Sequence, residues 1–303
     1  MYVLNMLKRY LQIFPKNLRN LNQICVMNET VIDTFLLFSV DLELSPSKYG
    51  DQEYEDSINQ VFTILLDILN KYDIVGTFFV DGETCIKYPE IVKDLHSNGH
   101  EIGAHGFYHE SLVDFWPLTM KPMPKLSLLN RRVQNIRMSK KAICNIIGVN
   151  PVCFRAPYLA IDGKTLKILE SEGFLLDSSL YNPVFGKLSY PYHPSEIDPS
   201  CEGKIKLLEV PITVSPIPYR KFVYRRYPHI FELEEKEIEK TIQLVKTAFL
   251  ESNYPFALFV TLIHPWELRS PKMISKIFHF LTLMKGMEAI SITASQLLEK
   301  TNK

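Results

Sequence analysis

Apolar runs alternate along the chain with segments in which apolar residues recur every three or four positions. Residues 34–40, 76–80 and 256–263 are almost continuously apolar, which is typical of strands buried on both faces. Between the first two runs, residues 58–69 carry apolar side chains at helical spacing. Strands that alternate with helices predict βαβ units and a parallel sheet.

The alternation continues towards the C-terminus. We expect further strands at 101–104, 152–154, 207–211 and 289–292, and helices at 86–97, 127–147, 162–172, 234–252, 273–283 and 294–300. About seven βα units without a break between domains predict an α/β fold, a distorted (β/α) barrel of about seven strands. This barrel would occupy residues 31–303, after a helical N-terminal extension at 1–30. Residues 181–227 are rich in Pro, Tyr and His with little periodicity, which predicts a long loop excursion.

Charge and composition narrow the class of protein. The 34 Lys and Arg balance the 34 Asp and Glu, so no basic excess suggests nucleic acid as a partner. No stretch reaches the roughly 18 uncharged apolar residues of a membrane span. The sequence shows no signal peptide and its five cysteines form no CxxC pair, so we expect a cytoplasmic protein. Residues 1–30 mix apolar and basic positions, typical either of a helix at the inner membrane face or of an ordinary docking helix.

In barrels of this kind the carboxyl ends of the strands form the active site, so polar residues that follow strands are the candidates. Asp41 and Glu43 end the first strand, and because strand side chains alternate, both lie on one face. Two neighbouring carboxylates are costly unless a cation or a proton holds them together. The alternative is a polar strand terminus without a function.

His105 and His109 follow the third strand. Their spacing of four would place both imidazoles on one face of a helical turn, which suits two ligands of one metal ion. Histidine pairs at this spacing also occur by chance. With a carboxylate from the first strand, they predict a metal site of two histidines and one carboxylate.

Three more strand ends carry polar residues. Arg155 follows the strand at 152–154 and could orient a carboxylate, and Asp177 follows residues 173–176. His264 ends the strongest strand of the C-terminal half, beside Trp266, where a general acid would be placed. Taken singly, an arginine before a proline turn or a histidine after a strand is more often structural.

The ordered set SVDLE, HGFYH, RAPY, DSS and IHPW resembles the five motifs of the polysaccharide deacetylase (NodB-homology) family, in the branch with a VDxE or VDxD first motif. The resemblance covers residues 34–298. It implies a distorted (β/α) barrel with one divalent cation, usually zinc, although Co²⁺, Ni²⁺ or Fe²⁺ could replace it. It also implies an enzyme that hydrolyses a linear amide bond and removes an N-acyl group, commonly N-acetyl, from a sugar or glycan precursor.

The resemblance assigns a role to each motif residue. Asp41 matches the general base, Arg155 the residue that orients it, and His264 the general acid. Asp177 matches a looser motif, with a role in holding His264 or Arg155. The remaining matches are the metal ligands Glu43, His105 and His109, and the aromatic residues Tyr158 and Trp266, which would contact the sugar.

One position departs from the family pattern. Most members carry a second Asp directly after the base, where it binds the metal, but this chain has Leu42. Glu43 lies on the correct face to replace it. Two alternatives stay open at this point: a hydrolase of small cyclic amides or ureides, similar to allantoinase, and a carbohydrate-binding barrel without catalytic activity.

Overall fold

A computed structural model describes residues 32–43, 52–113, 129–181, 190–216, 219–221, 224–226, 228–252 and 254–301. The main sheet contains β1 (Thr34–Leu42), β2 (Gly76–Val80), β3 (Glu101–Ala104), β4 (Cys153–Phe154), β5 (Leu176–Asp177), β6 (Leu208–Glu209), β9 (Ala257–Val260) and β10 (Ile290–Ser291). The α-helices are α2 (Gln52–Lys71), α3 (Gly82–Lys87), α4 (Pro89–Ser97), α5 (Leu129–Ile147), α6 (Gly163–Ser171), α7 (Glu235–Glu251), α8 (Pro271–Gly286) and α9 (Ala294–Thr301). Short 3₁₀ turns occur at η3 (Pro157–Leu159), η4 (Ile230–Glu232) and η5 (Pro265–Arg269).

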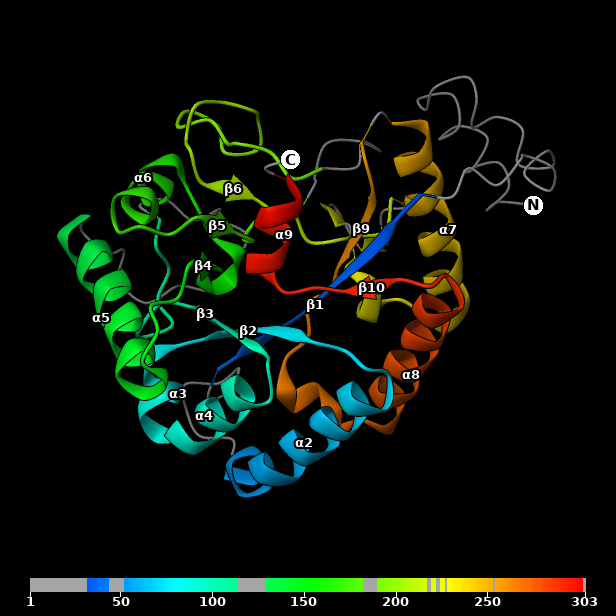
Figure 1. The fold of residues 1–303 in the computed structure, drawn as a ribbon, viewed down its shortest axis with the longest axis horizontal. Helices are drawn as coiled ribbons and strands as arrows, with labels where there is room; N and C mark the ends of the chain where they lie inside the picture. Colours follow the sequence, from blue (N-terminus) through cyan, green and yellow to red (C-terminus); the bar gives the residue numbers. More distant parts are fainter. Residues whose placement is uncertain are drawn as a thin grey trace.

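The sheet is parallel, and most of its strands follow chain order. Its order is β10-β1-β2-β3-β4-β5-β6, and β9 also pairs with β1. After β6, the Thr213 N–H donates to the Val260 carbonyl (2.9 Å) and the Val260 N–H donates to Thr213 Oγ1 (2.8 Å), so the chain after β6 meets β9. Helices surround the curved sheet (Figure 1). The predicted distorted (β/α) barrel is confirmed, with the two-residue β5 as an additional strand that the sequence did not predict.

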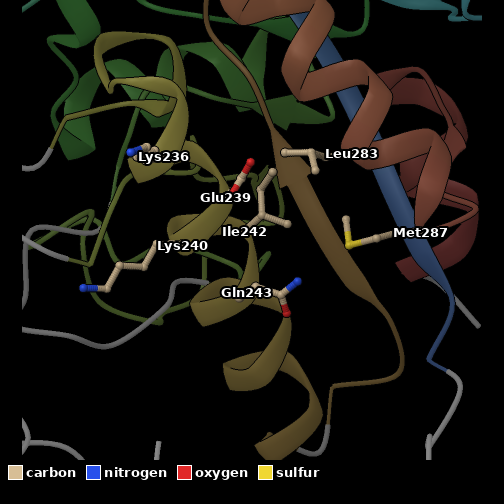
Figure 2. A pocket seen from close by; sticks show the side chains of 7 residues that line it. All are labelled: Lys236, Glu239, Lys240, Ile242, Gln243, Leu283 and Met287. Carbon is tan, nitrogen blue, oxygen red and sulfur yellow. The ribbon is translucent and has the colours of Figure 1, made fainter. Parts of the chain in front are cut away.

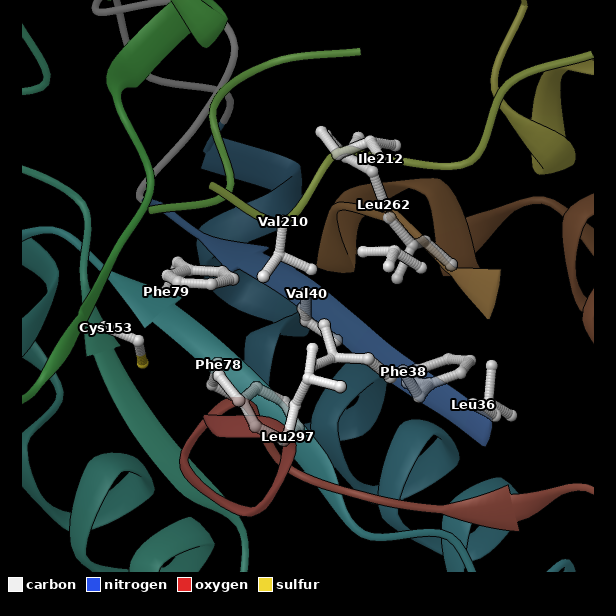
Figure 3. Packing of buried hydrophobic residues seen from close by; sticks show 14 of the residues in the cluster. Leu36, Phe38, Val40, Phe78, Phe79, Cys153, Val210, Ile212, Leu262 and Leu297 are labelled. Carbon is white, nitrogen blue, oxygen red and sulfur yellow. The ribbon is translucent and has the colours of Figure 1, made fainter. Parts of the chain in front are cut away.

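Helix α9 packs against the core at the amino ends of the strands. All nine residues of β1 are buried, as its continuous apolar run predicts. Figure 3 shows Leu297 of α9 among the buried side chains of β1 and β2. The first turn of α9 is fixed at the amino ends of the strands, because the Ala294 N–H donates to Thr77 Oγ1 (3.0 Å) and the Ser295 N–H to Glu101 Oε2 (2.9 Å). The carboxyl ends of the strands lie at the opposite end.

Two elements differ from the sequence prediction. The helix expected at 86–97 is two helices, because Pro89 lacks an N–H and starts α4 at its first position. The excursion at 181–227 contains the strand expected at 207–211, which is β6 of the main sheet, and in addition an unpredicted antiparallel hairpin of β7 (Tyr219–Lys221) and β8 (Tyr224–Arg226). The extension at 1–30 lies outside the described residues. No helix within the described ranges is long and apolar enough to cross a membrane.

Candidate active site

The register of the sheet brings the ends of the strands to one level. The last residues of strands β1 to β6 are Cα partners, each paired with the next one across the sheet: Leu42, Val80, Ala104, Phe154, Asp177 and Glu209. The residue that follows each partner in the chain therefore emerges at the same edge. For the first five strands these residues are Glu43, Asp81, His105, Arg155 and Ser178. Parallel topology thus collects side chains that are far apart in sequence.

Glu43, His105 and His109 form the cluster that the sequence predicts. Each offers a ligand atom, and the three atoms lie within 4.8 Å of one another. Glu43 Oε2 lies against His109 Nε2 and 3.9 Å from His105 Nε2. This oxygen is buried and accepts no hydrogen bond from the described residues. A buried carboxylate oxygen that faces two imidazole nitrogens without a donor is suited to bind a divalent cation, so Glu43 fits the place of the missing Asp.

A hydrogen bond to the backbone fixes the orientation of the His105 ring. Its Nδ1 lies 2.8 Å from the Arg155 carbonyl oxygen, which can only accept, so Nδ1 donates and Nε2 keeps its lone pair for the cluster. Burial lowers the pKa of His105 to about 4. The ring is therefore neutral at physiological pH, which is the form that binds a metal.

The two histidines do not lie on a helical turn, contrary to the spacing argument. Residues 105–113 form a loop in which Gly106 (φ 71°) and His109 (φ 48°) are left-handed. The carbonyls of Gly106 and Phe107 accept the N–H groups of Gly82 (2.9 Å) and Glu83 (3.1 Å) at the start of α3. A curled loop held by α3 brings the imidazole rings to 5.2 Å between centroids.

Asp41 is held by Arg155 inside the barrel. Arg155 Nη1 donates to Asp41 Oδ1 (2.8 Å), while Nε and Nη2 donate to the carbonyl and hydroxyl of Ser178 (2.7 and 2.8 Å). Both side chains of the ion pair are buried. Burial acts to raise the pKa of Asp41, but the charges of Arg155, His105 and His264 outweigh it and hold this pKa below its ordinary value. Asp41 is therefore an ionised carboxylate in a fixed position.

His264 reaches the cluster from the segment after β9, where Ile263 pairs with Val40 of β1. Its Nε2 lies 3.7 Å from Glu43 Oε1, and its ring stacks on Trp266 at 4.4 Å between centroids. Its Nδ1 lies 3.3 Å from Glu267 Oε2, which also accepts the His264 N–H (2.7 Å). Burial acts to lower the pKa of His264, but the Glu267 hydrogen bond and the charges of Asp41 and Glu43 outweigh it, so this pKa is raised.

Sequence reasoning missed Glu267. The signal was present, because an acidic residue three positions after a helix-capping residue is the spacing of a capping box. Glu267 occupies that position in η5, after His264. It connects the predicted general acid to the turn that follows the strand.

Asp177 ends β5 at the level of the other strand ends, but its hydrogen-bond partners differ from those expected. Its carboxylate accepts the Ser179 hydroxyl (2.7 Å) and the Ser179 N–H (3.3 Å). Within the described ranges no hydrogen bond joins it to His264 or Arg155. Its neighbour across the sheet is Glu209, which is also wholly buried. The catalytic role of Asp177 stays a prediction.

Asp81 is a second residue that the sequence prediction omitted. It is buried at the end of β2 and caps α3 by accepting the Thr84 N–H (2.7 Å) and hydroxyl (2.9 Å). Burial raises the pKa of its carboxyl group to about 7. Asp81 directly follows the strand predicted at 76–80, so the rule that found Asp41 could have found it too.

Tyr158 lies at the rim of the cluster. Its ring is 4.6 Å from that of His109, and 41% of the residue is exposed. Tyr158 (φ 60°) and Leu159 (φ 55°) are both left-handed, a costly conformation that persists where surrounding structure enforces it, often at functional sites. Trp266 is half-buried beneath His264. Contact of either residue with a sugar stays a prediction.

Two of the surface pockets can be compared with the predicted site. One, of about 460 Å³, adjoins the loop of residues 105–113 and is lined by Tyr108, Asn130, Arg131, Gln134 and Asn135. The other, of about 380 Å³, lies between α7 and α8 and is lined by Lys236, Glu239, Lys240, Ile242, Gln243, Leu283 and Met287 (Figure 2). Neither of these pockets is lined by a predicted site residue.

Comparisons with known proteins find similarity to polysaccharide deacetylases. Residues 51–176 match the family model of polysaccharide deacetylase. The peptidoglycan deacetylase of Helicobacter pylori is 23% identical over 250 residues, which cover 75% of this chain and 80% of that protein. Chitin deacetylase 1 of Cryptococcus neoformans is 29% identical over 121 residues, 40% of this chain but only 23% of that protein.

A solved structure extends the likeness of fold to most of the chain. A Mycobacterium smegmatis protein assigned to the polysaccharide deacetylases superposes with a TM-score of 0.60 at 22% identity, over 91% of this chain and 92% of that one. The segment matched by the family model contains His105, His109 and Arg155. Asp41, Glu43 and His264 lie outside that segment, so their place in the site rests on the geometry above.

Proposed function

We propose that this chain, whose residues 51–176 match the family model of polysaccharide deacetylase, is a metal-dependent hydrolase that removes the N-acetyl group from an amino sugar of a glycan. One observation carries this proposal: the Glu43, His105 and His109 cluster lies beside both a fixed carboxylate, Asp41, and a histidine, His264. The names of the relatives, peptidoglycan deacetylase and chitin deacetylase, favour a glycan over a small cyclic amide.

Glu43, His105 Nε2 and His109 Nε2 would hold one divalent cation, for which we propose zinc. Two imidazoles and one carboxylate are a common ligand set of catalytic zinc, although Co²⁺, Ni²⁺ and Fe²⁺ accept the same atoms. When bound, such a cation polarises an amide carbonyl and lowers the pKa of water.

The protein's own groups move the protons. Asp41, ionised and held by Arg155, accepts the proton of the attacking water as the new C–O bond forms. His264, with its raised pKa, donates a proton to the amide nitrogen as the C–N bond breaks, because an amine leaves poorly without one. The products are acetate and the free amine of the sugar.

Acetate release tests the proposed function. Protein loaded with zinc is expected to release acetate and an equal amount of amine from N-acetylglucosamine oligomers. Chelation should abolish this release and added zinc should restore it, because the cation supplies the Lewis acid. No acetate from any N-acetylated glycan, at one bound metal per chain, would refute the proposal, and hydrolysis of allantoin instead would favour the cyclic-amide alternative.

Replacement of Glu267 tests the general acid. We expect Glu267→Ala to lower kcat at least about tenfold, part of the roughly 10²–10⁴-fold that a positioned acid or base contributes, because His264 loses the group that orients it. Metal content should not change. The matched control is Glu239→Ala, which removes a Glu–His pair with His279 (3.2 Å) between α7 and α8. Equal kcat in the two variants would remove Glu267 from this role.

Location within the cell is proposed from the sequence alone. We propose a cytoplasmic protein whose residues 1–30 contact the inner face of a membrane. Cell fractionation of the full chain and of a chain without these residues would test this. Equal recovery in the soluble fraction would refute the membrane contact.

A further inference from the structure

Asp177 and Glu209 form a buried pair of carboxyl groups beneath the site. They are Cα partners on β5 and β6, and both residues are wholly buried. Each carboxyl group shifts the pKa of the other, so the two side chains lie side by side. Carboxylates accept but cannot donate, so a hydrogen bond between them requires that one of the two groups carries a proton. Two ionised carboxylates in such a place would repel strongly.

The other contacts indicate which group carries the proton. Both oxygens of Asp177 already accept hydrogen bonds from Ser179. Glu209 Oε1 accepts the Leu180 N–H (2.9 Å), whereas its Oε2 is buried and has no donor among the described residues. Oε2 is therefore the atom that can hold the proton and donate it to Asp177. Burial and the neighbouring Asp177 carboxylate raise the pKa of Glu209 well above its ordinary value.

Two other charged or titratable groups face the pair. The charge of Arg155 lowers the pKa of both carboxyl groups, but burial outweighs it. The Tyr192 hydroxyl lies nearby but donates to the Pro199 carbonyl (2.7 Å), so it does not supply the missing donor.

The pair connects to the active site through residues 177–179. The Ser179 hydroxyl donates to Asp177 and accepts the Ala156 N–H (2.8 Å), directly before the Tyr158 turn. The carbonyl and hydroxyl of Ser178 accept two N–H groups of Arg155. A shift of this segment would thus move the turn at the rim and the residue that holds Asp41.

We infer that Glu209 is a positioning residue: it holds a proton and donates it to Asp177, and this hydrogen bond keeps residues 177–179 in the arrangement that fixes Arg155 and the Tyr158 turn. The inference rests on the proposed function for its kinetic effect. The proton itself can be tested without any substrate.

Two variants of Glu209, compared with zinc bound, test the kinetic effect. Glu209→Ala is expected to lower kcat at least tenfold at unchanged metal content. Glu209→Gln is expected to keep kcat within about threefold of wild type, because its amide N–H can donate to Asp177 while its carbonyl accepts the Leu180 N–H. The control is Glu101→Ala, which removes a glutamate bound to Ser295 at the opposite end of the same sheet. This control should lower the melting temperature without lowering kcat.

Infrared spectroscopy tests the proton independently of activity. The difference between wild type and Glu209→Gln at pH 7 should contain the C=O stretching band of a protonated carboxyl group. Absence of this band would overturn the shared proton, even if Glu209→Ala fails to fold. Wild-type kcat in Glu209→Ala, or equal losses in the Ala and Gln variants, would overturn the positioning role. A wild type that shows the band but releases no acetate would refute the proposed function and leave the proton assignment standing.

Discussion

Asp41→Asn is expected to lower kcat by on the order of 10²-fold or more, the scale of general base catalysis, while one metal per chain remains bound. Asparagine has nearly the same shape, and its Oδ1 can still accept the hydrogen bond from Arg155 Nη1 (2.8 Å in the wild type). It cannot take a proton from water. Steady-state acetate release together with elemental analysis of the same sample would measure both effects.

A matched control separates this chemical effect from the loss of a buried ion pair. Asp162 pairs with the wholly buried Arg132 (3.0 Å) at the start of α6, outside the metal cluster. Asp162→Asn should lower the melting temperature and keep kcat. If Asp41→Asn retained near-normal kcat, Asp41 would not be the base, and if both variants lost activity equally, the loss would reflect stability.

Glu43→Ala is expected to abolish stoichiometric metal binding, and with it acetate release. Removal of one of three ligands should weaken metal affinity by more than the roughly 10–100-fold that loss of an outer hydrogen-bond partner costs. Without Glu43, the two imidazoles lack the carboxylate that completes the three-ligand cluster. Elemental analysis after dialysis, with titration of zinc into the apoprotein, would give both stoichiometry and affinity.

The control for Glu43 is another buried glutamate, in the loop of residues 105–113. Glu110 follows His109 and pairs with Arg131, but it is not part of the cluster. Glu110→Gln should keep one metal per chain. Stoichiometric metal in Glu43→Ala would show that the third ligand is another group, and the buried Asp81 would be the first to replace next.

Several features of the fold and site could be predicted from local sequence. The apolar run of β1 identifies a strand buried on both faces, and the carboxylates after it share a face because side chains alternate. Parallel βαβ topology then sends every strand end to one edge of the sheet. These local rules were sufficient to predict that Asp41, Glu43, His105 and Arg155 lie together at one edge of the sheet.

Other features depended on contacts between distant segments. The loop at 105–109 is curled because the N–H groups of α3 hold its carbonyls, which the spacing of two histidines does not reveal. The partners of Asp177 depended on the register of β6, a two-residue strand within a region of little periodicity.

The sequence by itself therefore determined which residue types stand at the strand ends, because periodicity is a local property of the chain. The tertiary structure decided which of them lie close enough to share a metal, a proton or a hydrogen bond. Such sharing requires two groups within about 3 Å in the correct orientation, and only the packing of distant segments sets that distance.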